Sequence, residues 1–195
     1  MGMRTVVVVI PSAGAFFSFL CAGRRQAHCL AQRLGTERIT AILCSPYSRT
    51  IETSTPLSQV TGVRICCDDA LAETHGAERI PPPSARFPFF PTLDLDYHGM
   101  ITLPRDEEED FPRAFFTRLH EGVRGLEAQL RTSGGGQVVL VTHAACCVAM
   151  VGALLRVRLE AVAKAGACSV STVRLNLPVV LFLNERRVIM HAGVP

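Results

Sequence analysis

Apolar positions along the chain form two kinds of pattern, short continuous runs and helical stripes. The runs are rich in β-branched residues, which is typical of strands that are buried on both faces of a parallel sheet. Strands are predicted at residues 6–10, 39–44, 63–67, 138–141, 169–175, 179–183 and 187–191. The last two are expected to join through a turn at Asn184 and Glu185.

Helical stripes separate these runs. Within residues 16–34, Leu20, Ala27, Leu30 and Leu34 recur at steps of seven, three and four, and arginine and glutamine fill many of the remaining positions. This spacing places the apolar side chains on one face of a helix. Further helices are predicted at residues 48–60, 111–130 and 144–155.

The order of elements is β-α-β-α-β, an insertion, and then α-β-α-β. It predicts a single domain over residues 1–195 with an α/β fold of three layers, in which helices cover both faces of an open, mostly parallel sheet. Functional sites in such sheets lie just beyond the carboxyl ends of the strands. Three segments occupy such positions: residues 11–14, 44–49 and 142–144.

Residues 76–105 are expected to be an irregular insertion, because prolines interrupt every periodicity there. A long irregular segment within a compact domain is usually functional or a linker. Its aromatic residues predict that it packs against another surface, either of its own domain or of a partner protein. They are Phe87, Phe89, Phe90 and Tyr97.

Composition narrows the classes of function. With 48% hydrophobic and 19% charged residues, the 195-residue chain can bury a sizeable core. A net charge of +3 without a run of Lys or Arg argues against direct nucleic-acid binding. The acidic run at residues 106–110 is expected to be solvated. No apolar stretch is long enough to predict a membrane span, and no ligand cluster predicts a metal or another cofactor.

The eight cysteines form no CxxC pair, and most lie in apolar runs. They are expected to be free thiols that pack as small hydrophobic residues, in a reducing intracellular compartment such as the cytoplasm or nucleus. Cys146 and Cys147 open a predicted buried helix. A helix N-terminus can lower the pKa of a thiol, but core packing is the favoured interpretation here.

Four short motifs stand on successive elements in a specific order. They are Gly23–Gln26–Ala27, then Ser45–Pro46 with Arg49 and Thr53, then Leu71–Ala72–Glu73, and then the strand that leads to Thr142–His143–Ala144. Together they resemble the histidine phosphatase superfamily, which has the phosphoglycerate mutase-like fold, over nearly the whole chain. Within that superfamily the chain looks most like the phosphatases that suppress T-cell receptor signalling.

The resemblance implies a phosphate site. In the family, one histidine attacks phosphorus, two arginines clamp the oxygens, a second histidine donates to the phosphoryl group, and a carboxylic acid protonates the leaving oxygen. By resemblance Arg49 is the second arginine, His143 the second histidine and Glu73 the acid. Taken alone, Arg49 would more often pair with Glu52 or Asp68 on the surface.

The first motif departs from the family. Where the family ends its first strand with Arg-His-Gly, this chain has Pro11–Ser12–Ala13–Gly14, so Ser12 stands at the position of the nucleophile. The next loop is shortened to residues 15–18, and in the family it normally walls the phosphate pocket.

We therefore expect a catalytically impaired pseudophosphatase that acts as an interaction or scaffold module, with a protein partner at residues 76–105. A phosphorylated ligand at Arg49, His143 and Ser12 is a second expectation. The alternative is an active phosphomonoesterase in which Ser12 or His143 replaces the lost nucleophile, although Ser12 has no evident general base beside it.

Overall fold

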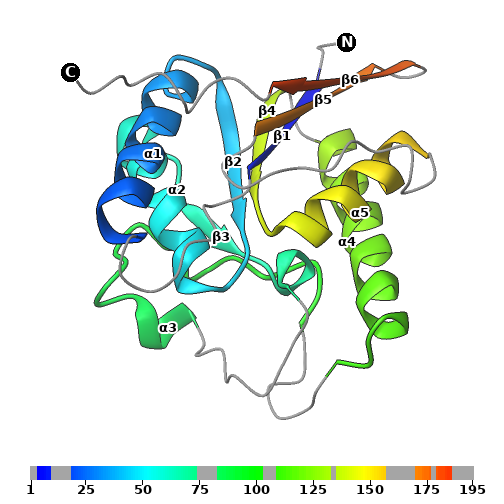
Figure 1. The fold of residues 1–195 in the computed structure, drawn as a ribbon, viewed down its shortest axis with the longest axis horizontal. Helices are drawn as coiled ribbons and strands as arrows, with labels where there is room; N and C mark the ends of the chain where they lie inside the picture. Colours follow the sequence, from blue (N-terminus) through cyan, green and yellow to red (C-terminus); the bar gives the residue numbers. More distant parts are fainter. Residues whose placement is uncertain are drawn as a thin grey trace.

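The computed structural model describes residues 4–9, 19–73, 83–102, 109–132, 135–156, 170–176 and 179–185. Within them one sheet forms the centre of the molecule, with the strand order β3-β2-β4-β1-β5-β6 (Figure 1). Its strands are β1 (Arg4–Val9), β2 (Ile39–Cys44), β3 (Ile65–Cys67), β4 (Gly136–Val141), β5 (Val170–Asn176) and β6 (Val179–Glu185). The pairs β1–β4, β2–β4 and β2–β3 are parallel, whereas β1–β5 and β5–β6 are antiparallel.

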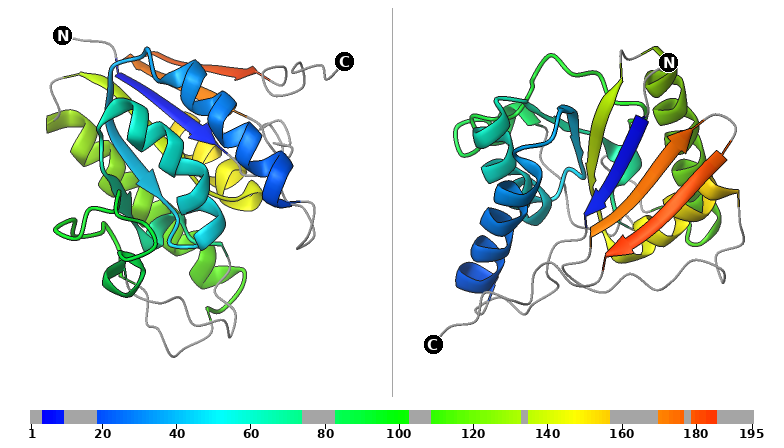
Figure 2. Two further views of the ribbon diagram at one scale, coloured as in Figure 1. Left: turned by 90° about the vertical axis from the view of Figure 1, so that its left-hand side faces the viewer. Right: turned by 90° about the horizontal axis from the view of Figure 1, so that it is seen from above.

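Helices cover both faces of this sheet, as Figure 2 shows from two sides. They are α1 (Phe19–Leu34), α2 (Ser48–Thr61), α3 (Pro83–Arg86), α4 (Arg113–Thr132) and α5 (Ala144–Leu155), with a short 3₁₀ helix, η1, at Asp69–Leu71.

Alternate residues of the strands face opposite layers. Val7 and Val9 of β1 pack with α1 and α2, whereas Val6 and Val8 pack with α4 and α5. This alternation is why a run of consecutive valines suits a strand between two helical layers. The predicted α/β fold with a mostly parallel sheet is confirmed.

One sequence prediction about the C-terminal strands is wrong. Asn184 and Glu185 were expected to form a turn, but both lie within β6, where they pair with Ser171 and Val170. The antiparallel register accounts for this, because every residue of β5 finds a partner and the ladder continues to the end of β6. The predicted strand at 187–191 lies outside the described residues.

The described part of the insertion packs on the chain itself. Phe87 and Phe90 contact the core layer of α1 and α2, and Leu93 is fully buried and forms a parallel bridge with Ile65 of β3. The hydroxyl of Tyr97 donates to Asp68 Oδ2 at 2.7 Å. Phe89 differs from these residues, because 79% of its surface is exposed.

Within the described ranges, no helix combines the length and the apolar character needed to cross a membrane.

Candidate phosphate site

Three parallel strands bring their carboxyl ends to one point. The amide of Thr142, just after β4, donates to the carbonyl of Val9 at the end of β1 at 3.0 Å. The amide of Ser45, just after β2, donates to the carbonyl of Val141 at 2.9 Å. The segments 44–49 and 142–144 therefore lie side by side, as the sequence predicted. Segment 11–14, which includes Ser12, lies outside the described residues.

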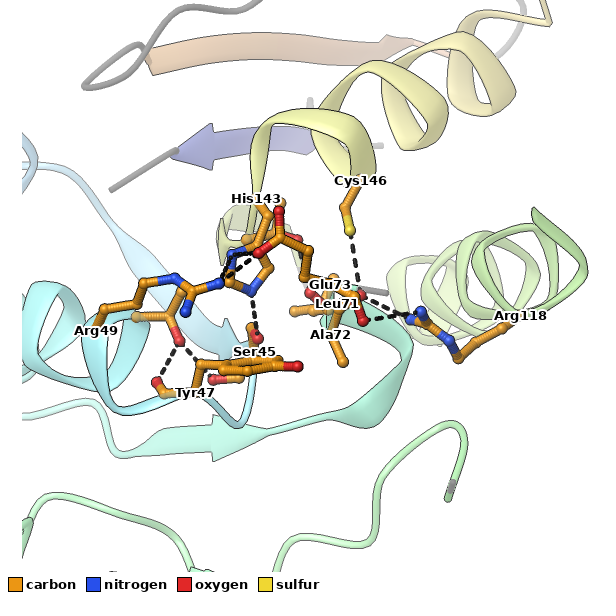
Figure 3. Close-up of polar contacts among 11 residues, drawn as sticks. Ser45, Tyr47, Arg49, Leu71, Ala72, Glu73, Arg118, His143 and Cys146 are labelled. Atoms are coloured by element: carbon orange, nitrogen blue, oxygen red, sulfur yellow. Dashed lines mark hydrogen bonds and ion pairs between the residues drawn. The ribbon is translucent and has the colours of Figure 1, made fainter. Parts of the chain in front are cut away.

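His143 stands at the N-cap of α5 and is buried, with 4% of its surface exposed. Its Nε2 lies 2.8 Å from Ser45 Oγ, and its Nδ1 lies 3.0 Å from Arg49 Nη2 (Figure 3). A guanidinium group can only donate, so Nδ1 accepts and the single proton of the neutral ring sits on Nε2. Burial, and then the positive charges of Arg49 and Arg118, lower the pKa of His143 to about 3. The ring is therefore neutral at physiological pH.

Arg49 lies in the first turn of α2 and pairs with Glu73. Its Nη2 is 2.5 Å from Glu73 Oε2, and the two side chains are 37% and 43% exposed. The alternative pairing with Asp68 does not form, because Asp68 accepts hydrogen bonds from Tyr97 and from the amide of Met100. The same Glu73 oxygen lies 3.5 Å from His143 Nδ1. The structure thus brings Arg49, Glu73 and His143 together.

Tyr47 is a site residue that the sequence interpretation missed. The Arg49 guanidinium lies 4.5 Å above the centre of its ring, and the His143 ring meets it edge-on at 5.2 Å between centroids. Such contacts favour a cation over the ring face and restrict both partners to one orientation. The signal in the sequence is an aromatic residue between the Ser-Pro pair and the arginine.

The backbone that carries Glu73 is held by a second arginine. Arg118 Nη1 donates to the carbonyls of Asp69, Ala70 and Ala72 at 3.0, 3.2 and 2.9 Å. Its Nη2 reaches the carbonyl of Glu73 at 3.4 Å. Arg118 therefore links α4 to η1 and to the residues directly after it, and so fixes the position from which Glu73 enters the site.

Glu109 neutralises this buried arginine. Its carboxylate accepts from Arg118 Nε at 2.6 Å and from Nη2 at 2.8 Å, and both side chains are 4% exposed. The expectation that residues 106–110 are solvated is therefore wrong for Glu109. A buried charge requires a partner, and the two-pronged geometry of guanidinium and carboxylate provides one. The sequence signal was Arg118 itself, a charge on the apolar stripe of Phe115 and Leu119.

The cysteines beside the site are packing residues, as expected. Cys146 and Cys147 are buried, and Cys146 Sγ donates to the carbonyl of Ala72 at 3.2 Å. Burial raises the pKa of Cys146 to about 11, so the helix N-terminus does not produce a thiolate here. Cys29, Cys44, Cys66 and Cys67 are also free thiols.

The net charge of the three described site residues is close to zero. Arg49 contributes one positive charge, Glu73 one negative charge, and His143 none. In the part of the chain that the structure describes, no group of three or more His, Cys, Asp or Glu side chains could hold a metal ion.

The chain belongs to the histidine phosphatase superfamily, branch 1, whose sequence model matches residues 20–178. The matched range starts after the Pro11–Ser12–Ala13–Gly14 segment and includes Arg49, Glu73 and His143. No curated protein sequence matches the chain significantly.

Several solved structures share the fold. An ecdysone phosphate phosphatase from Bombix mori, in complex with tungstate, superposes with a TM-score of 0.73 at 14% identity, over 98% of this chain and 95% of that one. A mycobacterial glucosyl-3-phosphoglycerate phosphatase gives 0.63 at 20% identity, over 94% and 97%. A phosphoglycerate mutase from Bacillus anthracis str. Sterne gives 0.65 at 12% identity, over 94% and 93%. At these identities the likeness shows the fold, which is phosphoglycerate mutase-like.

Proposed function

We propose that this chain is a histidine phosphatase-like module that binds a phosphate group without turning it over, and that acts through contact with another protein. We propose further that it forms a single domain in a reducing, intracellular compartment. The free thiols of Cys44, Cys67 and Cys146 support a reducing environment.

The main support for a phosphate site is that three side chains lie together, those of Arg49, Glu73 and His143. Arg49 is a permanent cation, its side chain is 37% exposed, and its guanidinium is oriented by Tyr47 and Glu73. The neutral His143 ring accepts from Arg49 through Nδ1 and so helps to orient the guanidinium without adding a desolvated positive charge. Arginine suits phosphate because its planar fork matches two phosphate oxygens.

The proposal that turnover is lost rests on the residues directly after β1. Val9 ends this strand beside Thr142, so the chain leaves β1 at the edge where His143 stands. The next residues are Ile10, Pro11 and Ser12, and the first histidine of the sequence is His28, which is exposed on α1. The chain therefore has no imidazole at the position where the family forms its covalent phosphohistidine. Loss of a nucleophile costs on the order of a millionfold in turnover in a serine protease.

The observed hydrogen bonds disfavour a replacement nucleophile among the described residues. His143 Nε2–H donates a hydrogen bond to Ser45 Oγ, so His143 is not arranged to remove a proton from Ser45. A ring with a pKa of about 3 is a weak base and a weak nucleophile. Ser45 is also fully buried, which keeps a substrate away from its hydroxyl.

The insertion supports the proposed contact with a protein. Most of its apolar residues pack on the chain, yet Phe89 projects with 79% of its surface exposed. An exposed aromatic residue on a folded segment is a favourable anchor for a partner, since aromatic side chains dominate binding energies at interfaces. Affinity capture with wild type and Phe89→Ser tests this contact, with Val60→Ser as the control because Val60 is 62% exposed on α2. A partner retained equally by all three chains would contradict the role of Phe89.

The phosphate site is tested by two measurements on one preparation, binding of inorganic phosphate and hydrolysis of an aryl phosphate. The proposal predicts saturable phosphate binding and no hydrolysis. Arg49→Met is expected to abolish binding, whereas Glu52→Gln, an exposed change three residues along the same helix, leaves it unchanged. Equal binding by wild type and Arg49→Met would contradict the assignment of the site.

A further inference from the structure

A carboxylate lies where an anion would enter the site. Glu73 Oε2 contacts Arg49 Nη2 at 2.5 Å and lies 3.5 Å from His143 Nδ1 (Figure 3). One oxygen of this side chain thus occupies the place beside the Arg49 guanidinium that an anion would take. An anion bound to Arg49 there would lie next to the Glu73 side chain.

The described residues around this position provide little positive charge. Arg49 from α2 is the cation of the described site, since His143 at the start of α5 is neutral and Cys146 of the same helix is a thiol. Arg118 of α4 is committed to Glu109 and to backbone carbonyls. A fully ionised anion would therefore meet one guanidinium and, opposite it, a carboxylate.

The backbone that carries Glu73 is held in place. The carbonyl of Ala72, one residue before it, accepts from Arg118 Nη1 at 2.9 Å and from Cys146 Sγ at 3.2 Å, and Arg118 Nη2 reaches the carbonyl of Glu73 itself. The backbone is fixed while the side chain, 43% exposed, stays accessible to solutes. The Glu73 side chain therefore starts from a fixed point beside Arg49, from which its carboxylate can reach an anion bound there.

An ionised carboxylate can only accept hydrogen bonds, so the anion that suits it is one that carries a hydrogen-bond donor. Inorganic phosphate carries at least one P–OH group near neutral pH, as do phosphomonoesters in their monoanionic form, whose second pKa is about 6. Sulfate has no such proton. A P–OH group can donate to Glu73 while its other oxygens accept from Arg49.

We propose that Glu73 is the specificity-determining residue of this site, and that it selects phosphoryl groups that carry a proton over fully ionised oxyanions such as sulfate. This inference rests on the proposed phosphate binding and names its ligand class. The Arg49–Glu73 contact observed here is the state that such a ligand replaces, with P–OH donating to the carboxylate and the phosphoryl oxygens accepting from the guanidinium.

Equilibrium dialysis with radiolabelled phosphate, and competition by sulfate, tests the inference at neutral pH. Wild type is expected to prefer phosphate over sulfate by about tenfold or more, the contribution of one hydrogen bond to a charged group. Glu73→Gln replaces the negative charge with an amide whose N–H groups donate to either anion, so sulfate affinity should rise about tenfold or more and the preference should disappear. Glu52→Gln also removes a negative charge from the surface and should keep the wild-type preference.

The possible results distinguish a failure of the selectivity of Glu73 from a failure of the phosphate site itself. Equal affinity of wild type for phosphate and sulfate overturns the selectivity and leaves anion binding intact. A preference for phosphate that survives in Glu73→Gln overturns the role of Glu73. Absence of phosphate binding in both wild type and Glu73→Gln overturns the phosphate site itself. If only Glu73→Gln binds, and it binds both anions, Glu73 excludes anions without selecting among them. That result also overturns the inference.

Discussion

The Arg118 guanidinium and the Glu109 carboxylate form a two-pronged ion pair whose side chains are both 4% exposed. Through its backbone hydrogen bonds, Arg118 connects α4 to the loop that carries Glu73. The position of a site carboxylate thus depends on a buried charge on a different helix.

Breaking this ion pair should destabilise the protein far more than replacing it. Glu109→Gln leaves the Arg118 charge buried without its counter-ion and is expected to lower the free energy of unfolding by about 3 kcal/mol or more. The double variant Arg118→Met with Glu109→Gln should lose less than the sum of the two single changes. Urea denaturation measures all four chains of this double-mutant cycle. Additive effects would contradict a coupled pair.

The stability of the protein should decrease on acidification because His143 is buried in its neutral form. Its folded pKa of about 3 lies below the ordinary value of 6.5, so the unfolded chain binds a proton that the folded chain does not. The stabilising contribution is full above pH 6.5 and is lost as the pH falls toward 3. At about pH 4.5 the free energy of unfolding should be roughly 2–3 kcal/mol lower than above the ordinary pKa of histidine.

Chemical denaturation as a function of pH measures this effect. His143→Gln should flatten the pH dependence between the two pKa values, whereas His120→Gln, an exposed change on α4, should retain it. An identical profile for wild type and His143→Gln would show that folding does not lower the pKa of His143.

The carboxylate of Asp68 anchors the insertion to the sheet. Its Oδ2 accepts from Tyr97 and from the amide of Met100, each at 2.7 Å, and its Oδ1 accepts from the amide of Ala70 at 2.9 Å. Burial, followed by the bond to Asp68, raises the pKa of Tyr97, so the phenol remains a donor. Tyr97→Phe should cost about 2 kcal/mol, because a hydrogen bond to a charged group is lost.

Limited proteolysis should locate that effect. Cleavage within residues 87–102 is expected to accelerate in Tyr97→Phe relative to cleavage elsewhere, while His98→Gln, an exposed neighbour, should resemble wild type. Uniform acceleration along the chain would mean that Tyr97 does not anchor the insertion.

Two glycines of α4 provide a matched test of how closely this helix approaches η1. A Cβ atom at Gly122 would lie 2.6 Å from the Cβ of Ala70, whereas at Gly125 it would meet the flexible side chain of Met100 at 3.0 Å. Gly122→Ala should destabilise by about 1–3 kcal/mol through overpacking. Gly125→Ala should be near neutral, because a gain of about 1 kcal/mol in helix propensity offsets the tighter contact. Equal melting temperatures for the two variants would contradict the close approach.

The sequence predicted the strands of the parallel core, all four long helices and the gathering of Arg49, Glu73 and His143. The strands and helices follow from local periodicity, and the proximity of segments 44–49 and 142–144 follows from the rule that parallel strands end at one edge. The place of Glu73 in the site was implied by the family resemblance. It did not predict Tyr47 as a support for Arg49 or the pairing of Glu109 with Arg118, because both depend on contacts between distant segments. The end of β6 was also missed, since pairing with β5 overrides the turn preference of Asn184.

We expect the site to hold a phosphate group without hydrolysing its ester. The decisive experiment is hydrolysis of p-nitrophenyl phosphate by wild type, with His143→Ala purified in parallel as the control for contaminating phosphatase. Wild type should release no nitrophenol above the His143→Ala control. Turnover by wild type that is lost in His143→Ala would contradict it and would make the chain an active phosphomonoesterase with a replacement nucleophile.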